Sequence, residues 1–246
     1  MLVTVMSARF AAVDWDELRI RVGTAPGDVA MGAPAVTVAV LAAVLVVAVP
    51  PVWQVLRLAV TLVHELGHAL VGLAVGRRFT GFVLRGDMSG HAVTVGPARG
   101  FGRVISTWAG YPAPAVVGAA IVWAAGRGWA APVLTLVILI CLLALVRVRS
   151  LLTAVVMLVA MGATAALWWW RDDALQAQVL VATGIVLLIG GWRHLGAVMS
   201  SRTRGSDPDV LASLTHVPRG IWVASFVLVC AAATVLAAID VAAAWG

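Results

Sequence analysis

The stretch "TLVHELGHALVG", residues 61–72, places two histidines and a glutamate in an otherwise apolar segment. Ionisable groups are costly inside a bilayer, and within a membrane span they are functional candidates by default. On a helix, His64 and His68 lie four residues apart on one face, where both imidazoles can bind one metal ion. The stretch therefore predicts a metal site carried by a membrane-spanning helix.

The composition indicates a membrane protein. Of the 246 residues, 62% are hydrophobic and 11% are charged, whereas about 25% of the residues of a soluble domain are charged. We expect an all-α polytopic membrane protein with a single domain over residues 1–246, made of a cytoplasmic N-terminal arm (1–33) and a transmembrane core (34–246). Its basic residues are all arginines, scattered singly or in pairs between apolar runs. The lipid bilayer is thus the expected partner, and nucleic acid is not.

Seven apolar segments are candidate membrane spans. They cover roughly residues 34–50, 52–76, 104–125, 130–146, 150–170, 177–198 and 220–244, and a span needs about 20 residues. Pro50-Pro51 separates the first two. An N-terminus on the inside puts most arginines on the cytoplasmic side, as the positive-inside rule requires. The odd number of spans then leaves the C-terminus outside, with the 77–103 loop in the cytoplasm.

A short β-hairpin is expected directly after the second span. Strand-forming residues at Phe79–Leu84 and His91–Val95 flank a Gly-Asp-Met-Ser-Gly turn. The hairpin could be a re-entrant loop that binds an extended substrate along its free edge, with Gly90 and His91 as candidate contacts. The alternative is a plain cytoplasmic loop.

The start of the third span carries a second set of candidate substrate contacts. Gly110, Pro112 and Pro114 should loosen the helix there. The backbone groups that this frees could hold substrate near the metal, or could simply mark a kink.

The arrangement His-Glu-x-x-His combines two zinc ligands with a general base. Glu65 lies beside the two histidines and can take a proton from a zinc-bound water, which then attacks a peptide carbonyl. One alternative is a polar cluster that joins helices through hydrogen bonds. Others are a catalytically silent metal-binding scaffold and a transporter. Because a structural metal site needs no base, Glu65 favours the enzyme, a zinc metalloendopeptidase.

The sequence offers several candidates for the third metal ligand. Asp172, Asp173 and Asp240 are expected near the outer face, and no glutamate follows Glu65. The segment "RGSDPDVLASLTHVP", residues 204–218, can fold back from the cytoplasmic side and supplies Asp207 and, less favoured, Asp209. Asp207 also fits the cap of a helix that starts at Pro208. His91 and His216 remain minor alternatives.

Several motifs resemble the site-2 protease class of intramembrane zinc metalloproteases, particularly a compact bacterial branch. They are "HELGHAL" at 64–70, "RGDMSGH" at 85–91, "AGYPAP" at 109–114, "SDPDVLASLT" at 206–215 and "VPRGIW" at 217–222. The resemblance implies Zn2+ as cofactor, Asp207 as third ligand, a membrane-protein or peptide substrate, and a multi-pass location in the bacterial cell membrane. The better-known members carry an Asp-Gly motif in a late span, which this chain lacks.

Overall fold

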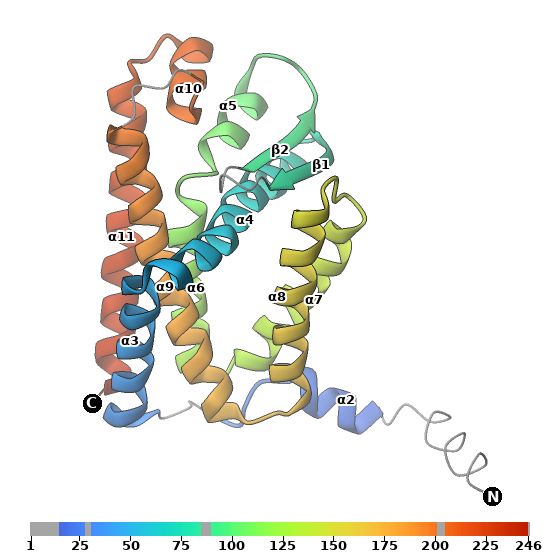
Figure 1. Cartoon of the computed structure of the whole chain (residues 1–246), viewed down its shortest axis with the longest axis vertical. Helices are drawn as coiled ribbons and strands as arrows, with labels where there is room; N and C mark the ends of the chain where they lie inside the picture. The colour runs from blue at the N-terminus through green and yellow to red at the C-terminus, as the bar shows by residue number, and fades with distance from the viewer. Residues whose placement is uncertain (1–14, 28–30, 85–89, 201–204, 246) are drawn as a thin grey trace, which may run out of the picture.

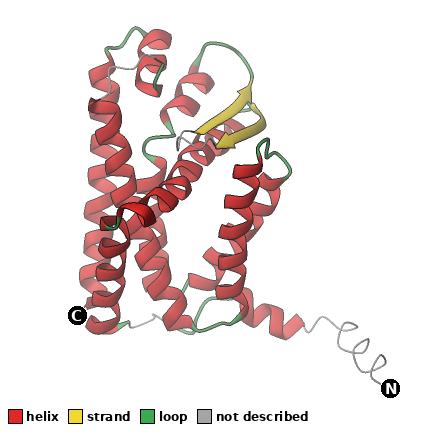
Figure 2. Cartoon of the chain, in the orientation of Figure 1, coloured by secondary structure: helices red, strands yellow, loops and turns green. Residues whose placement is uncertain are grey.

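The computed structural model describes residues 15–27, 31–84, 90–200 and 205–245, apart from the side chains of Leu84, His91, Ala92 and Trp245. It is mostly helical (Figures 1 and 2). The helices are α2 (Trp15–Val22), α3 (Gly32–Ala48), α4 (Pro50–Ala74), α5 (Phe101–Trp108), α6 (Ala113–Gly126), α7 (Ala130–Leu145), α8 (Leu151–Trp169), α9 (Asp173–Ser200), α10 (Asp207–Thr215) and α11 (Arg219–Trp245). Strands β1 (Arg78–Leu84) and β2 (Gly90–Val95) form one antiparallel sheet. The expected helical membrane fold with a hairpin after α4 is confirmed.

The count of seven spans is not confirmed. In the described part of the chain, four helices are long and apolar enough to cross a membrane, namely α4, α8, α9 and α11. Helices α5 and α6 make a fifth span only if they are counted together, because they are bent by 65° at the break between them. Helices α3 and α7 are apolar but shorter. The apolar runs of the sequence therefore mark the helices correctly, and the number of helices that cross a bilayer stays a prediction.

Helix α9 lies at the centre of the bundle, between α6, α3 and α11. Its contact with α6 is close because small residues meet: a Cβ added to Gly184 would lie 2.6 Å from the carbonyl oxygen of Gly118. Small residues let helix backbones approach in membranes, where packing rather than the hydrophobic effect drives association. By contrast, 11% of the most apolar stretch of α8 is buried inside the protein, so most of its apolar surface is left for lipid.

The chain bends between α3 and α4 without reversing. Val49 is extended, with φ −85° and ψ 109°, and Pro50 starts α4 at once. Figure 1 shows α3 rising to the middle of the molecule and α4 continuing to the end that carries the hairpin. A 17-residue helix is about 25 Å long at 1.5 Å per residue, so α3 covers only part of the bundle's length.

This bend corrects the predicted position of the N-terminal arm relative to the 77–103 loop. The backbone N–H of Ala25 donates to the carbonyl of Gly128 at 2.8 Å. The Arg21 guanidinium lies over the ring of Trp169 at 4.5 Å. The described part of the arm thus lies at the end opposite the hairpin, together with the C-terminal end of α11 (Figure 1). The sequence analysis treated α3 as a full span and so placed the arm on the wrong side of that loop.

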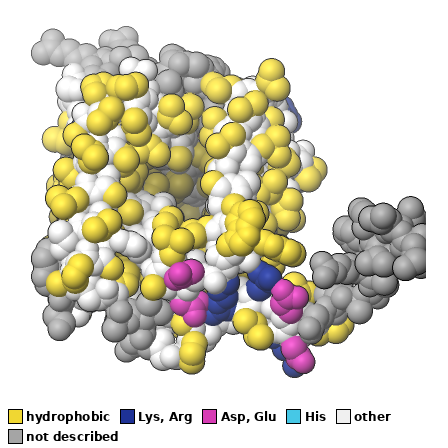
Figure 3. All heavy atoms as spheres, turned by 60° about the horizontal axis from the view of Figure 1, so that its bottom comes forward, with side chains coloured by type: hydrophobic (Ala, Val, Ile, Leu, Met, Phe, Trp, Pro, Cys, Tyr) yellow, Lys and Arg dark blue, Asp and Glu magenta, His cyan; other side chains and the backbone are white. Residues whose placement is uncertain are grey.

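The two ends of the bundle differ in charge. The hairpin end holds Arg77, Arg78, Arg99, Arg103, Arg147, Arg149 and Arg219, and the opposite end holds Arg19, Arg21, Arg127 and Arg171. Figure 3 shows the opposite end, where acidic and basic side chains gather in one zone beneath otherwise hydrophobic sides. The excess of arginine at the hairpin end predicts, by the positive-inside rule, that this end faces the cytoplasm.

Cysteine labelling in intact cells tests both the position of the N-terminal arm and the orientation of the hairpin end. In a chain lacking Cys141 and Cys230, exposed single cysteines would be introduced as Ala98→Cys at the hairpin end and as Ile20→Cys and Ala174→Cys at the other end. A membrane-impermeant maleimide is expected to label the latter two and to spare the first. Protection of Ile20→Cys with labelling of Ala174→Cys would restore the arm to the hairpin side, and labelling of Ala98→Cys would reverse the orientation.

Candidate metal centre

Helix α4 carries three of the predicted functional residues. It starts with Pro50-Pro51 in its first turn, where the missing N–H groups cost nothing. Glu65 is 4% exposed, and the His64 and His68 side chains are 13% and 14% exposed. Three polar groups are therefore largely removed from solvent within one turn of an apolar helix.

The break between α5 and α6 lies against the two histidines. A Cβ on Gly110 would come within 2.3 Å of His68 Nε2 and 2.8 Å of His64 Nε2. Only glycine leaves room for both rings at this approach. The predicted loosening of this segment is confirmed by the 65° bend. Pro112 is buried and directly precedes α6.

Asp207 comes from α10, a short helix at the hairpin end, and is its first residue. The cap is Ser206, which corrects the prediction that Asp207 caps a helix starting at Pro208. Ser206 Oγ and the Ser206 N–H both donate to Asp209 Oδ2, at 2.7 and 3.2 Å. The serine takes this role because its backbone is extended while its carbonyl already accepts from the Asp209 N–H.

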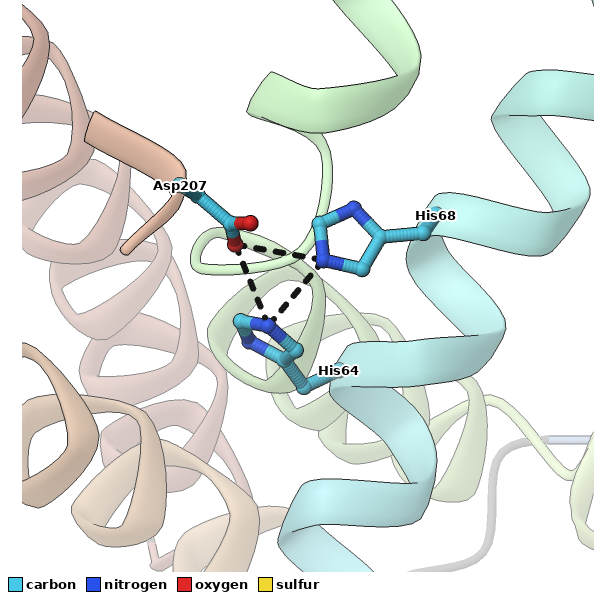
Figure 4. Close-up of side chains that lie close together, drawn as sticks. All are labelled: His64, His68 and Asp207. Carbon is cyan, nitrogen blue, oxygen red and sulfur yellow. Dashed lines mark hydrogen bonds and ion pairs between the residues drawn. The ribbon is translucent and has the colours of Figure 1, made fainter. Parts of the chain in front are cut away.

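The side chains of His64, His68 and Asp207 converge, as Figure 4 shows. His64 Nε2 lies 3.1 Å from His68 Nε2, and Asp207 Oδ2 lies 3.3 Å from the first nitrogen and 3.2 Å from the second. Burial works to raise the pKa of Asp207, but the two histidines beside its carboxyl group outweigh that effect and hold the pKa below its ordinary value. The carboxyl group is therefore anionic.

These three atoms fit a zinc ion in both spacing and chemistry. Ligands bound at about 2.0–2.1 Å around a tetrahedral zinc lie roughly 3.3 Å from one another. His68 Nδ1 is 2.7 Å from the carbonyl oxygen of Ser106, which can only accept, so Nδ1 carries a proton, and the neutral form of His68 would present its lone pair at Nε2. Lone pairs of two neutral imidazoles and a carboxylate that meet this closely repel each other, and a metal ion between them would remove that repulsion.

Glu65 is covered by Gly90, the first residue of the second hairpin strand. A Cβ on Gly90 would lie 2.6 Å from Glu65 Oε1 and 2.8 Å from Thr61 Cγ2. The first residue of β2 thus packs directly on the carboxylate. The predicted substrate contact Gly90 lies beside the predicted base.

Among the residues that the structure describes, no other ligand candidate joins the three. Asp209 is engaged by Ser206 and forms a 3.0 Å ion pair with Arg219. His216 ends α10 with a left-handed backbone (φ 60°). The backbone of His91 pairs with Val83 in the sheet, while its side chain and the whole of Asp87 lie outside the described residues. At the opposite end lie Asp172, Asp173 and Asp240, the last two paired with Arg171 and Arg127.

Two residues next to the metal centre were not predicted from the sequence. The ring of Tyr111 packs edge-on against His64, with centroids 4.9 Å apart, and stacks on Phe226. Ser106 supplies the carbonyl that orients His68. Tyr111 could have been noticed as the chain's single tyrosine, inside the "AGYPAP" motif. No sequence pattern marks a backbone carbonyl.

A sequence profile of the Peptidase M50B-like family matches residues 37–237, which include all of these residues. The chain belongs to the site-2 protease family. Searches of curated proteins and of solved structures gave no significant match. Site-2 proteases are zinc-dependent membrane peptidases, so the family and the geometry of the three side chains point to the same chemistry.

In this member of the family, Gly110→Ala is expected to lower zinc affinity and activity together. The added methyl group cannot coexist with the His68 ring at 2.3 Å, and a ligand displaced by about 1 Å can cost on the order of 100-fold in rate. The matched control is Gly162→Ala, because a Cβ there meets nothing within 4 Å. Zinc titration and a cleavage assay measure both. Unchanged zinc binding in Gly110→Ala would show that the two rings are free to move.

Proposed function

We propose that this protein is an intramembrane zinc metallopeptidase that hydrolyses peptide bonds of membrane-embedded or membrane-adjacent substrates. The observation that carries the proposal is the convergence of His64, His68 and Asp207 within 3.3 Å of one another, next to the buried Glu65 of the same helix. The match to a membrane peptidase family supports it. We also propose a multi-pass location in the cell membrane, with the hairpin end in the cytoplasm.

The residues divide the work. His64, His68 and Asp207 would hold the metal, and the Ser106 carbonyl, which lies at His68 Nδ1, would keep the lone pair of the opposite ring nitrogen aimed at it. Zinc would polarise the scissile carbonyl and lower the pKa of the attacking water. Glu65 takes the proton from that water and returns it to the leaving amine. The side chain can act in this way because it is a carboxylate beside the ligands without being one of them.

The sheet gives the substrate a route to the centre. The outer edge of β1 is already occupied, because the Phe82 N–H donates to the carbonyl of Arg147 and the Arg149 N–H donates to that of Phe82. Among the described residues, no strand pairs with the outer edge of β2. An extended peptide added along β2 would run past Gly90 and so past Glu65. Strand addition suits a protease because it draws the substrate backbone into an extended form.

A catalytically silent scaffold of the same fold is the rival function. A purely structural zinc site is normally closed by four protein ligands, whereas three protein ligands form the group here within the described residues. An open fourth position and a buried glutamate at its side are needed for hydrolysis and serve no purpose in a scaffold.

The test uses the full-length protein in detergent. Elemental analysis is expected to give one zinc per chain. The probe for activity is a set of quenched fluorescent peptides, each with a span of about 20 apolar residues and flanking polar residues. Cleavage should stop on chelation and return when zinc is added. A folded chain that binds no zinc, or cleavage that resists chelation, would overturn the proposal.

A further inference from the structure

The two histidines of the centre are held differently. His68 Nδ1 is bonded to the Ser106 carbonyl, whereas His64 Nδ1 is buried and has no hydrogen-bond partner. A metal-binding histidine almost always donates its second ring N–H to an acceptor, which sets its tautomer and orientation. A buried N–H left without an acceptor also costs about 1–3 kcal/mol. His64 therefore needs an acceptor that the ligand set itself does not supply.

Helix α9 brings His194 to this position. A Cβ on Gly190 would lie 2.5 Å from Val60 Cγ2, so α9 and α4 touch at that point. His194 follows Gly190 by four positions and His64 follows Val60 by four positions, so each histidine lies one helical turn further along the same face. As a result the two rings are 6.1 Å apart between centroids, at an interplanar angle of 70°. His194 is half-buried.

Besides the second ligand His68, Tyr111 also has its ring beside His64, but it is less suited to accept a hydrogen bond from Nδ1. It is stacked on Phe226 with centroids 5.2 Å apart, which fixes its orientation. It presents its ring to His64 in an edge-on contact, and no hydrogen bond from Tyr111 reaches Nδ1. A neutral imidazole has one nitrogen that accepts, as a phenolic oxygen also does, so the stacked, edge-on orientation of Tyr111 is what separates the two candidates.

We propose that His194 is the positioning residue of His64. It accepts the hydrogen bond from His64 Nδ1–H, either after a rotation of its own side chain or through one bridging water, and so keeps the Nε2 lone pair aimed at the metal. The inference rests on the proposed function, because it takes His64 as a metal ligand. It adds an outer-sphere residue from α9, a helix that contributes no ligand to the group.

Zinc affinity is the decisive measurement, made on the full-length protein by competition with a chelator. His194→Leu is expected to weaken zinc binding about 10–100-fold, the usual effect of losing an outer-shell partner. His194→Gln keeps an acceptor oxygen and should recover most of the loss. After substitution with Co2+, the visible absorption of His194→Leu should shift while that of His194→Gln stays close to the parent. The melting temperature of the metal-free variants shows whether the fold is intact.

Two controls separate the possible outcomes. Tyr111→Phe removes the competing hydroxyl, and His216→Asn removes a histidine outside the centre while tolerating the left-handed backbone. Both should bind zinc like the parent. The inference is overturned if His194→Leu binds zinc as tightly as the parent, even where cleavage falls, or if Tyr111→Phe shows the loss instead. A parent that binds no zinc would instead remove the proposed function.

Discussion

Glu65→Gln is expected to keep the bound zinc and to slow peptide cleavage by roughly 10²–10⁴-fold, the usual contribution of a general base. Glutamine has nearly the same shape, so it should fit under Gly90, which approaches the glutamate oxygen closely. It cannot accept the proton of the attacking water. Zinc content and the cleavage rate, measured on the same preparation, test the two halves of this expectation.

The chain offers a matched control for this substitution. Glu17 is the only other glutamate, and it lies on the exposed helix α2, where it pairs with Arg21 at 2.6 Å. Glu17→Gln should cost at most about 1 kcal/mol as a surface ion pair and leave cleavage unchanged. Glu65→Gln with full activity would remove Glu65 as the base. If Glu65→Gln lost its zinc, Glu65 would instead be assigned a role in holding the metal.

The part of the centre that the sequence predicts well is the part carried by one helix. The spacing of His64, Glu65 and His68 determines their relative positions on α4, because helical geometry alone sets them. The hairpin was likewise predictable from strand-forming residues around a turn, and its observed strands differ from the predicted ones by a residue at one end of each. In both cases the deciding contacts are local.

The third ligand depends on contacts that are distant in sequence. Asp207 lies 139 positions after His68, so only the packing of α10 decides which of its acids reaches the histidines. Asp207 and Asp209 are two residues apart, which places them on nearly opposite faces of the helix. Sequence reasoning could restrict the ligand to this turn. It could not tell which face of the helix points to the histidines. The capping residue was wrong for a different, local reason: Ser206, one residue earlier, holds the extended backbone and the contacts with Asp209.

The position of α3 shows a different limit. A proline pair after an apolar run is compatible with a tight reversal and with a bend, since proline ends a helix in either case. The structure adopts the bend because α3 packs on α9 and because residues 21–27 contact Trp169 and Gly128. An apolar run measures how hydrophobic a segment is, and it leaves the direction of the next segment open.

Asp207→Asn is expected to weaken zinc binding more strongly than any outer-sphere change, and hence by more than about 100-fold. The asparagine side chain keeps the size of aspartate but loses the anionic oxygen that zinc prefers. Because Ser206 and Asp209 form the capping box, the substitution leaves the start of α10 intact. A loss of zinc affinity in this variant can therefore be assigned to the missing oxygen rather than to an unfolded helix.

Two substitutions in the same turn complete the argument. Ser206→Ala removes the cap and should cost about 0.5–2 kcal/mol of stability while leaving the three converging atoms in place. Asp209→Asn loses the ion pair with Arg219 and should leave zinc affinity within a few-fold of the parent. Chelator competition and thermal melting on all three variants give opposite patterns for a ligand and for a capping residue. If Asp207→Asn bound zinc as tightly as the parent while Asp209→Asn lost it, α10 would have to rotate by about half a turn on metal binding, since two residues span roughly 200° of the helix.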